Sequence, residues 1–183
     1  MILFFGPPGS GKSVQGKLLV ERNDWQWLST GELFRQSKDP EVLKRLATGE
    51  LIDDELTNKV LNEAIKGARE NAPIVLDGYP RNLAQVGWLT EYLPSHGRKI
   101  SCVILFEVPR QELINRLSGR GRAEDTPEVI SHRLDIYQEK TSPVVDRYRE
   151  NGVPVILVDG TGPISEVHER IQEAVMSCLK AKS

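Results

Sequence analysis

Apolar residues gather in short runs along the chain, and longer stretches with helical spacing separate these runs. Four of the runs have the composition of buried strands, at residues 1–5, 73–77, 100–108 and 153–159. A shorter run at residues 25–29 predicts a fifth strand. Apolar strands that alternate with helices are typical of a parallel sheet with helices on both faces. The pattern therefore predicts a three-layer α/β/α fold built on five parallel strands.

Between these runs, apolar residues recur at the spacing of amphipathic helices. Residues 30–59 contain small helical segments between two predicted strands, and we expect them to form a flap that can move against the main layers. Thr126 is expected to open a long helix that extends to about Glu150. Two further helices are predicted to bury apolar side chains, which are Val14, Leu18 and Leu19 in one and Leu83, Val86, Trp88 and Leu89 in the other.

The first predicted strand leads directly into Gly6-Pro7-Pro8-Gly9-Ser10-Gly11-Lys12-Ser13, which fits the phosphate-loop pattern G-x-x-x-x-G-K-[ST]. Glycines let a backbone wrap closely around a phosphate, and the helix that follows offers unpaired N–H groups and the positive end of its dipole. Lys12 adds a positive charge for the outer phosphates, and the Ser13 hydroxyl is a ligand suited to Mg²⁺. The order of strand, loop, lysine and helix predicts a P-loop site for a nucleoside triphosphate.

Charged residues follow two other predicted strands. Asp77 ends an apolar run, as does the carboxylate that lies near Mg²⁺ in P-loop proteins. Arg81 comes after a turn and is expected to point across the carboxyl ends of the strands, where ligands of such sheets bind. The segment 116–122 carries three arginines, and Arg133 is placed to return to the same cleft. These arginines are predicted to grip a transferring phosphate.

Composition narrows the function classes further. The net charge of −2 over 183 residues provides no global field for nucleic acid or an anionic membrane. No apolar run approaches the ~20 residues of a membrane-spanning helix. Cys102 and Cys178 do not make a disulfide framework, so we expect buried, inert thiols and a cytoplasmic location. The first strand begins at Met1, which leaves no room for a signal peptide. A monomer is expected because no apolar stripe is left over.

Taken in order, the motifs resemble those of the adenylate kinases, within the nucleoside monophosphate kinases. The resemblance covers nearly the whole chain and rests on the phosphate loop, Ser29-Thr30-Gly31-Glu32-Leu33-Phe34-Arg35, Gly49-Glu50-Leu51-Ile52-Asp53-Asp54-Glu55, Asp77-Gly78-Tyr79-Pro80-Arg81, Arg116-Leu117-Ser118-Gly119-Arg120, Arg122-Ala123-Glu124-Asp125 and Asp159-Gly160-Thr161. It implies a single P-loop NTPase-type domain, with a core at residues 1–29, 60–115 and 127–183, a monophosphate-binding flap at residues 30–59 and a very short lid at about residues 116–126.

The resemblance also implies roles for individual residues. ATP-binding residues would be Gly9, Ser10, Gly11, Lys12, Ser13, Val14, Arg116 and Gly162. AMP-binding residues would be Thr30, Arg35, Glu50, Leu51, Ile52, Gly78, Tyr79, Pro80, Arg81, Gln85, Arg122 and Arg133. Catalytic residues would be Lys12, Arg81, Arg116, Arg120, Arg122 and Arg133. Ser13 and Asp77 would hold Mg²⁺, directly or through water. Gln85 would read the adenine edge, and Thr30 would lie against the base.

The implied activity is reversible phosphoryl transfer, MgATP + AMP ⇌ 2 ADP, with small-molecule nucleotides as the partners. This sequence departs from the family pattern at Ser13, where most members have Gly, at Val14, where most have Thr, and at Glu124, which replaces an Asp. A single residue separates Arg120 from Arg122, where long members insert a larger lid. The segment has no Cys or His quartet, so no zinc-stabilised lid is expected.

Two alternatives stay open from the residues. One is the same chemistry on another base, a UMP/CMP or GMP kinase, because Asn82 is similar to the residue of the UMP/CMP branch. Gln85 favours adenine, since its amide offers both a donor and an acceptor. The other is a non-catalytic nucleotide switch. Against a switch, the chain lacks an N-K-x-D guanine motif, and a switch has no need of Arg35 and Arg81 as a second phosphate grip.

Overall fold

A computed structural model of the chain describes residues 1–70 and 72–180. Its centre is a sheet of five strands, which are β1 (Ile2–Phe5), β2 (Gln26–Ser29), β3 (Ile74–Asp77), β4 (Cys102–Glu107) and β5 (Val155–Asp159). The strands are all parallel and lie in the order β2-β3-β1-β4-β5. The predicted parallel sheet is confirmed, including the fifth strand at residues 25–29.

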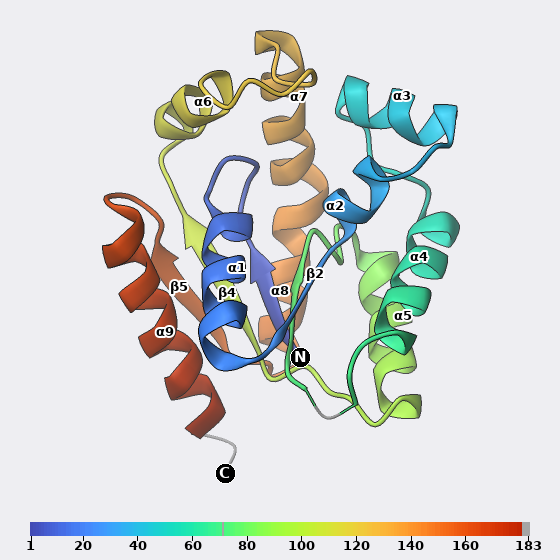
Figure 1. Cartoon of the computed structure of the whole chain (residues 1–183), viewed down its shortest axis with the longest axis vertical. Helices are drawn as coiled ribbons and strands as arrows, with labels where there is room; N and C mark the ends of the chain where they lie inside the picture. The colour runs from blue at the N-terminus through green and yellow to red at the C-terminus, as the bar shows by residue number, and fades with distance from the viewer. Residues whose placement is uncertain (71, 181–183) are drawn as a thin grey trace.

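Helices fill the connections between strands (Figure 1). They are α1 (Lys12–Asn23), α2 (Thr30–Arg35), α3 (Pro40–Thr48), α4 (Asp54–Lys66), α5 (Leu83–Ser95), α6 (Arg110–Ser118), α7 (Pro127–Ile136), the π-helical turn η1 (Tyr137–Thr141), α8 (Ser142–Glu150) and α9 (Ile164–Lys180). Residues 119–126 alone join α6 to α7.

The core has two sides because successive side chains of a strand point to opposite faces of the sheet. Ile2 and Phe4 of β1 pack with α1 and α9, whereas Leu3 and Phe5 pack with α4, α5 and α8. Every residue of β1 is at most 3% exposed. Burial on both faces explains why the strands carry continuous apolar runs rather than an alternating pattern. The three-layer α/β/α architecture predicted from the sequence is therefore confirmed.

The segment that contains α2 and α3 has a small core of its own. Phe34, Val42 and Ile52 bury their side chains against one another, apart from both faces of the sheet. Asp39 and Asp53 cap α3 and α4, since their carboxylates accept hydrogen bonds from Glu41 N and Glu55 N, each at 2.9 Å. The segment thus holds its shape largely through local contacts.

The long helix predicted from Thr126 to about Glu150 is confirmed, because residues 127–150 are helical without a gap. The π-helical turn η1, which was not predicted, lies within it between α7 and α8. Pro143, in the first turn of α8, has no N–H with which to bond the carbonyl of Glu139, and its ring crowds that carbonyl. The widened turn accommodates this residue, and the chain resumes an α-helical path afterwards.

Two apolar residues that we expected on buried helix faces are exposed. Val14 and Leu83 each keep 49% of their surface exposed to solvent. The buried face of α5 is centred near Leu89, and Leu83 lies about 120° round the helix from that residue. Val14 lies in the first turn of α1 and lines a cavity instead of the core.

Cys102 and Cys178 are 0% and 3% exposed, which confirms that both thiols are buried. Among the helices that the structure describes, none combines the length and the apolar character that crossing a membrane requires.

Candidate nucleotide site

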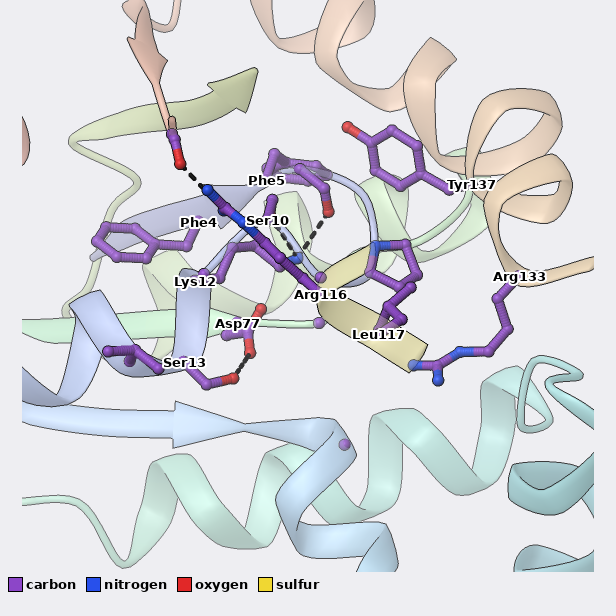
Figure 2. Close-up of a pocket in the computed structure, with 18 of the residues that line it drawn as sticks. Phe4, Phe5, Ser10, Lys12, Ser13, Asp77, Arg116, Leu117, Arg133 and Tyr137 are labelled. Carbon is purple, nitrogen blue, oxygen red and sulfur yellow. Dashed lines mark hydrogen bonds between the residues drawn. The ribbon is translucent and has the colours of Figure 1, made fainter. Parts of the chain in front are cut away.

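The loop between β1 and α1 wraps around the Lys12 ammonium group. Lys12 Nζ donates hydrogen bonds to Gly6 O at 2.7 Å, Pro7 O at 3.0 Å and Ser10 Oγ at 3.4 Å (Figure 2). Gly11, the N-cap of α1, has φ 94°, a conformation that residues with a side chain rarely adopt. The loop therefore leaves the first N–H groups of α1 and one ammonium group at a single point.

The charge on Lys12 is held in an environment that disfavours it. Burial lowers the pKa of Lys12 to about 8, and the nearby guanidinium groups of Arg81, Arg133 and Arg120 add to this effect. Asp77 works in the opposite direction. An anion at this point would stabilise the charged lysine, because it would offset the positive charge of the three arginines.

Asp77 ends β3 next to this lysine and is 6% exposed. Its Oδ2 accepts hydrogen bonds from Ser13 Oγ at 3.1 Å and Ser29 Oγ at 3.3 Å, and Figure 2 shows the contact with Ser13. Its Oδ1 is buried without a hydrogen-bond partner. A hydroxyl and a carboxylate with an unused oxygen are donors that suit a hard cation such as Mg²⁺. Within residues 1–70 and 72–180 there is no group of three His, Cys, Asp or Glu side chains that could hold a metal ion.

A cavity of about 660 Å³ lies over the loop and the ends of the strands. Six arginines from distant parts of the chain line it, namely Arg35, Arg81, Arg116, Arg120, Arg122 and Arg133. Burial lowers the pKa of Arg81, and it lowers the pKa of Arg133 to about 10. So many cations in one cavity repel one another, and an array of phosphates is the ligand that neutralises them.

One carboxylate opposes part of this charge. The Asp125 side chain is 2% exposed and accepts hydrogen bonds from Arg120 Nε at 2.8 Å and Nη2 at 2.5 Å, while Arg133 Nη1 lies 3.6 Å away. Burial raises the pKa of Asp125, but the hydrogen bonds and charge of Arg120 outweigh it, and the net shift is downward. Sequence reasoning noted Asp125 only as part of a motif. An acidic residue inside an arginine-rich loop was the available signal for this contact.

Comparisons with known proteins agree with this geometry. The family model described as adenylate kinase matches residues 4–153. An adenylate kinase of Micrococcus luteus is 40% identical over 98% of this chain and 92% of its own length. Those of Pseudarthrobacter chlorophenolicus, at 38% identity over 98% of both chains, and Kocuria rhizophila, at 40% over 95% and 97%, are similar. The chain belongs to the adenylate kinase family.

In this adenylate kinase family member, all the residues expected to bind ATP line the cavity: Gly9, Ser10, Gly11, Lys12, Ser13, Val14, Arg116 and Gly162. Arg116 Nε donates to Glu112 Oε1 at 2.8 Å, and its Nη1 donates to Gly160 O at 3.0 Å, the contact drawn in Figure 2. These two bonds hold the guanidinium group of Arg116, which lines the same cavity as the phosphate loop. Leu117 and Tyr137 also line the cavity, although sequence reasoning assigned neither of them a role in binding.

The residues expected to bind AMP divide into two groups. Eight line the cavity of this adenylate kinase family member: Arg35, Leu51, Gly78, Tyr79, Pro80, Arg81, Arg122 and Arg133. The other four, Thr30, Glu50, Ile52 and Gln85, lie outside that lining. Thr30 is 2% exposed and donates to Gly78 O at 2.9 Å, while Ile52 belongs to the small core around Phe34.

Glu50 contacts α7 instead of the cavity. Its Oε1 lies 2.7 Å from His132 Nε2. At the neighbouring Gly49, a Cβ atom would lie 2.7 Å from Arg133 Cγ and 3.1 Å from Val129 Cγ1. The α3–α4 connection therefore rests against α7, and glycine permits the close approach.

Proposed function

We propose that this protein catalyses MgATP + AMP ⇌ 2 ADP. One observation supports the proposal above all. A single cavity is lined both by Lys12 of the phosphate loop and by the guanidinium groups of Arg35 and Arg81. Arg120 and Arg133 line the same cavity. Two phosphate-binding centres joined by cationic side chains suit transfer of a phosphoryl group between two nucleotides.

In the proposed reaction, a phosphate oxygen of AMP attacks the γ-phosphorus of ATP in line with the bond to the bridging β–γ oxygen. The new P–O bond forms as that bond breaks, and ADP is produced on both sides. The attacking oxygen is already ionised, so no general base is needed. Lys12, Arg81, Arg116, Arg120, Arg122 and Arg133 then act by positioning the phosphates and by neutralising the charge that spreads over the transferring group.

Mg²⁺ would be held by Asp77 and Ser13, directly or through water, and would neutralise phosphate charge when bound with ATP. The buried, unpartnered Oδ1 of Asp77 and the adjacent Ser13 hydroxyl support this assignment. We hypothesise that Ser13 ligates the metal directly. Ser13→Gly should then raise the Mg²⁺ concentration needed for half-maximal activity, and an unchanged requirement would contradict the hypothesis.

We further propose that residues 30–59 act as the monophosphate-binding flap and residues 116–126 as the lid, and that their closure excludes water before transfer. The separate small core of the flap supports its movement as a unit. Thr30 and Gln85 lie just outside the cavity lining, and we assign them to contact with the base of AMP. We also propose that the protein is a monomer of the reducing cytoplasm. It would act on free nucleotides and would bind neither nucleic acid nor a membrane.

The test is ADP formation from MgATP with AMP, CMP, UMP, GMP or no acceptor. Preference for AMP is expected, and preference for a pyrimidine would redirect the proposal to a UMP/CMP kinase. Binding of ATP without transfer to any acceptor would indicate a nucleotide switch. Arg81→Ala and Arg120→Ala should each lower kcat/KM by about 10³-fold with the fold intact. Arg147→Ala, which removes an exposed arginine paired with Glu150, is the matched control and should stay near wild type.

A further inference from the structure

The Asp54 carboxylate, in the first turn of α4, connects that helix to the start of α5. Asn82 Nδ2 donates to Asp54 Oδ1 at 2.9 Å and to Oδ2 at 3.1 Å. Gln85 Nε2 donates to Asp54 Oδ1 at 2.7 Å. Asn82 also caps α5, because its Oδ1 accepts from Gln85 N at 2.9 Å. Asn82, the residue that suggested a pyrimidine-specific relative, is thus occupied in holding Asp54.

The amide of Gln85 is held on both sides. Its Nε2 faces the Asp54 carboxylate, and its Oε1 accepts a hydrogen bond from Arg81 N at 2.7 Å. A flipped amide would place its oxygen against the carboxylate and its NH₂ group against the Arg81 N–H, so both bonds would be replaced by repulsive contacts. Gln85 is 2% exposed, so both contacts are shielded from solvent. Asp54 and Arg81 N therefore permit one amide orientation only.

We infer that Asp54 is a positioning residue that sets the choice of purine by locking the Gln85 amide. This inference rests on the proposed transfer to AMP and on Gln85 as the residue that meets the base. With one hydrogen on Nε2 and one lone pair on Oε1 still unused, the locked amide offers a donor and an acceptor in fixed order. Adenine presents an acceptor at N1 and a donor at N6, which match that order. A 6-oxo purine presents a donor at N1 and an acceptor at O6, which match only the flipped amide.

A purely structural role for Asp54 makes a different prediction. Because Gln85 also bonds Arg81 N, loss of Asp54 could displace Arg81, which is assigned to the acceptor phosphate. AMP and IMP carry the same phosphate and ribose, so a displaced Arg81 would weaken transfer to both by the same factor. A Gln85 amide that is free to flip would instead change the activity with AMP relative to the activity with IMP. The AMP/IMP ratio of kcat/KM separates these roles.

The experiment compares Asp54→Asn with the wild-type protein, using AMP and IMP as acceptors. If the Gln85 amide flips, the NH₂ group introduced at position 54 can donate to Gln85 Oε1, so position 54 no longer opposes the flipped orientation and one of the two constraints on the amide is lost. We expect the AMP/IMP ratio to fall by about tenfold, the effect of one buried hydrogen-bond mismatch. Glu55→Gln makes the same change on an exposed neighbour in α4 and should leave the ratio unchanged.

A double variant provides the rescue. In D54N/N82D, the carboxylate introduced at position 82 would accept from the NH₂ group introduced at position 54, and the amide oxygen at position 54 would then face Gln85. The original order of donor and acceptor would return, and we expect a ratio within about threefold of wild type. Asn82→Ser keeps a capping hydroxyl for α5 but removes the donor that orients Asp54, so it should lower the ratio even if D54N fails to fold.

The outcomes are distinct. Wild-type preference for AMP, a narrowed ratio in D54N or N82S and recovery in D54N/N82D would support the inference. Equal losses for AMP and IMP in D54N and N82S, with the ratio preserved, would overturn it while the proposed function stands. A wild-type protein that transfers to neither purine would overturn the proposed function and, with it, the base assignment on which this inference rests.

Discussion

Raising the pH from ~7 to ~9 should weaken the binding of Mg-nucleotide by about tenfold, because Lys12 loses its proton over this range. Burial lowers the pKa of Lys12 to about 8. A bound phosphate adds negative charge beside Nζ and favours the charged form. The charge that binds phosphate is therefore fully present well below pH ~8 and is lost from the free protein as the pH rises through that value.

The magnitude follows from the protonation ratio. One pH unit above its pKa, the free lysine is about ten parts neutral to one part charged, and binding must first take up a proton. The apparent Kd then rises by about tenfold per pH unit until the pKa of the bound form is reached.

Isothermal titration calorimetry with a non-hydrolysable Mg-ATP analogue measures the effect without turnover. Titrations in buffers of different ionisation enthalpy report the proton taken up at high pH. Lys12→Arg is the control, since arginine stays charged over this range, and its Kd should be flat with pH even if binding is weaker. A wild-type Kd that is constant to pH ~9, or a Lys12→Arg Kd that follows the same curve, would refute the reasoning.

Three further predictions concern packing, flap contact and lid length. Gly16→Ala should destabilise the protein by about 1–3 kcal/mol in urea unfolding, because a Cβ there would lie 1.9 Å from Trp27 Cζ3, and an unchanged midpoint would contradict the packing. His132→Ala removes the contact with Glu50 and should raise KM for AMP at most about fivefold with little change in kcat, the effect of an exposed pair; a larger fall in kcat would assign His132 another role. The short lid should permit ATP hydrolysis without acceptor faster than in a long-lid relative, and equal rates would remove that idea.

Sequence reasoning predicted the strands and the phosphate loop because both depend on local order. Apolar runs identify strands buried on two faces, and the loop pattern needs only consecutive residues. The same reasoning predicted the helix from Thr126 but missed its π-helical turn, since it overlooked that Pro143 removes a backbone donor. It also placed Leu83 on a buried face, since spacing alone does not show where a helix passes the edge of its core.

The candidate site could be predicted only in part. The arginines and the strand-end Asp77 were identified as phosphate and metal residues, and the structure shows that they line one cavity. Their partners were not predicted. Three contacts depend on where the tertiary fold directs each side chain. They join residues 5, 31 and 82 positions apart in the sequence, which are Asp125 and Arg120, Asp54 and Gln85, and Glu50 and His132. No spacing rule along one element reports such pairs.

The sequence by itself determined the class of fold and the presence of a phosphate loop, since apolar patterning and backbone chemistry act over neighbouring residues. The tertiary structure decided which charges meet. Parallel strands bring their carboxyl ends to one edge, and that edge gathers Lys12, Asp77 and Arg81 from separate segments. Burial there lowers the pKa of Lys12, and it leaves the orientation of the Gln85 amide to its hydrogen-bond partners. Both effects arise because low solvent access makes each charge and hydrogen bond depend on its neighbours.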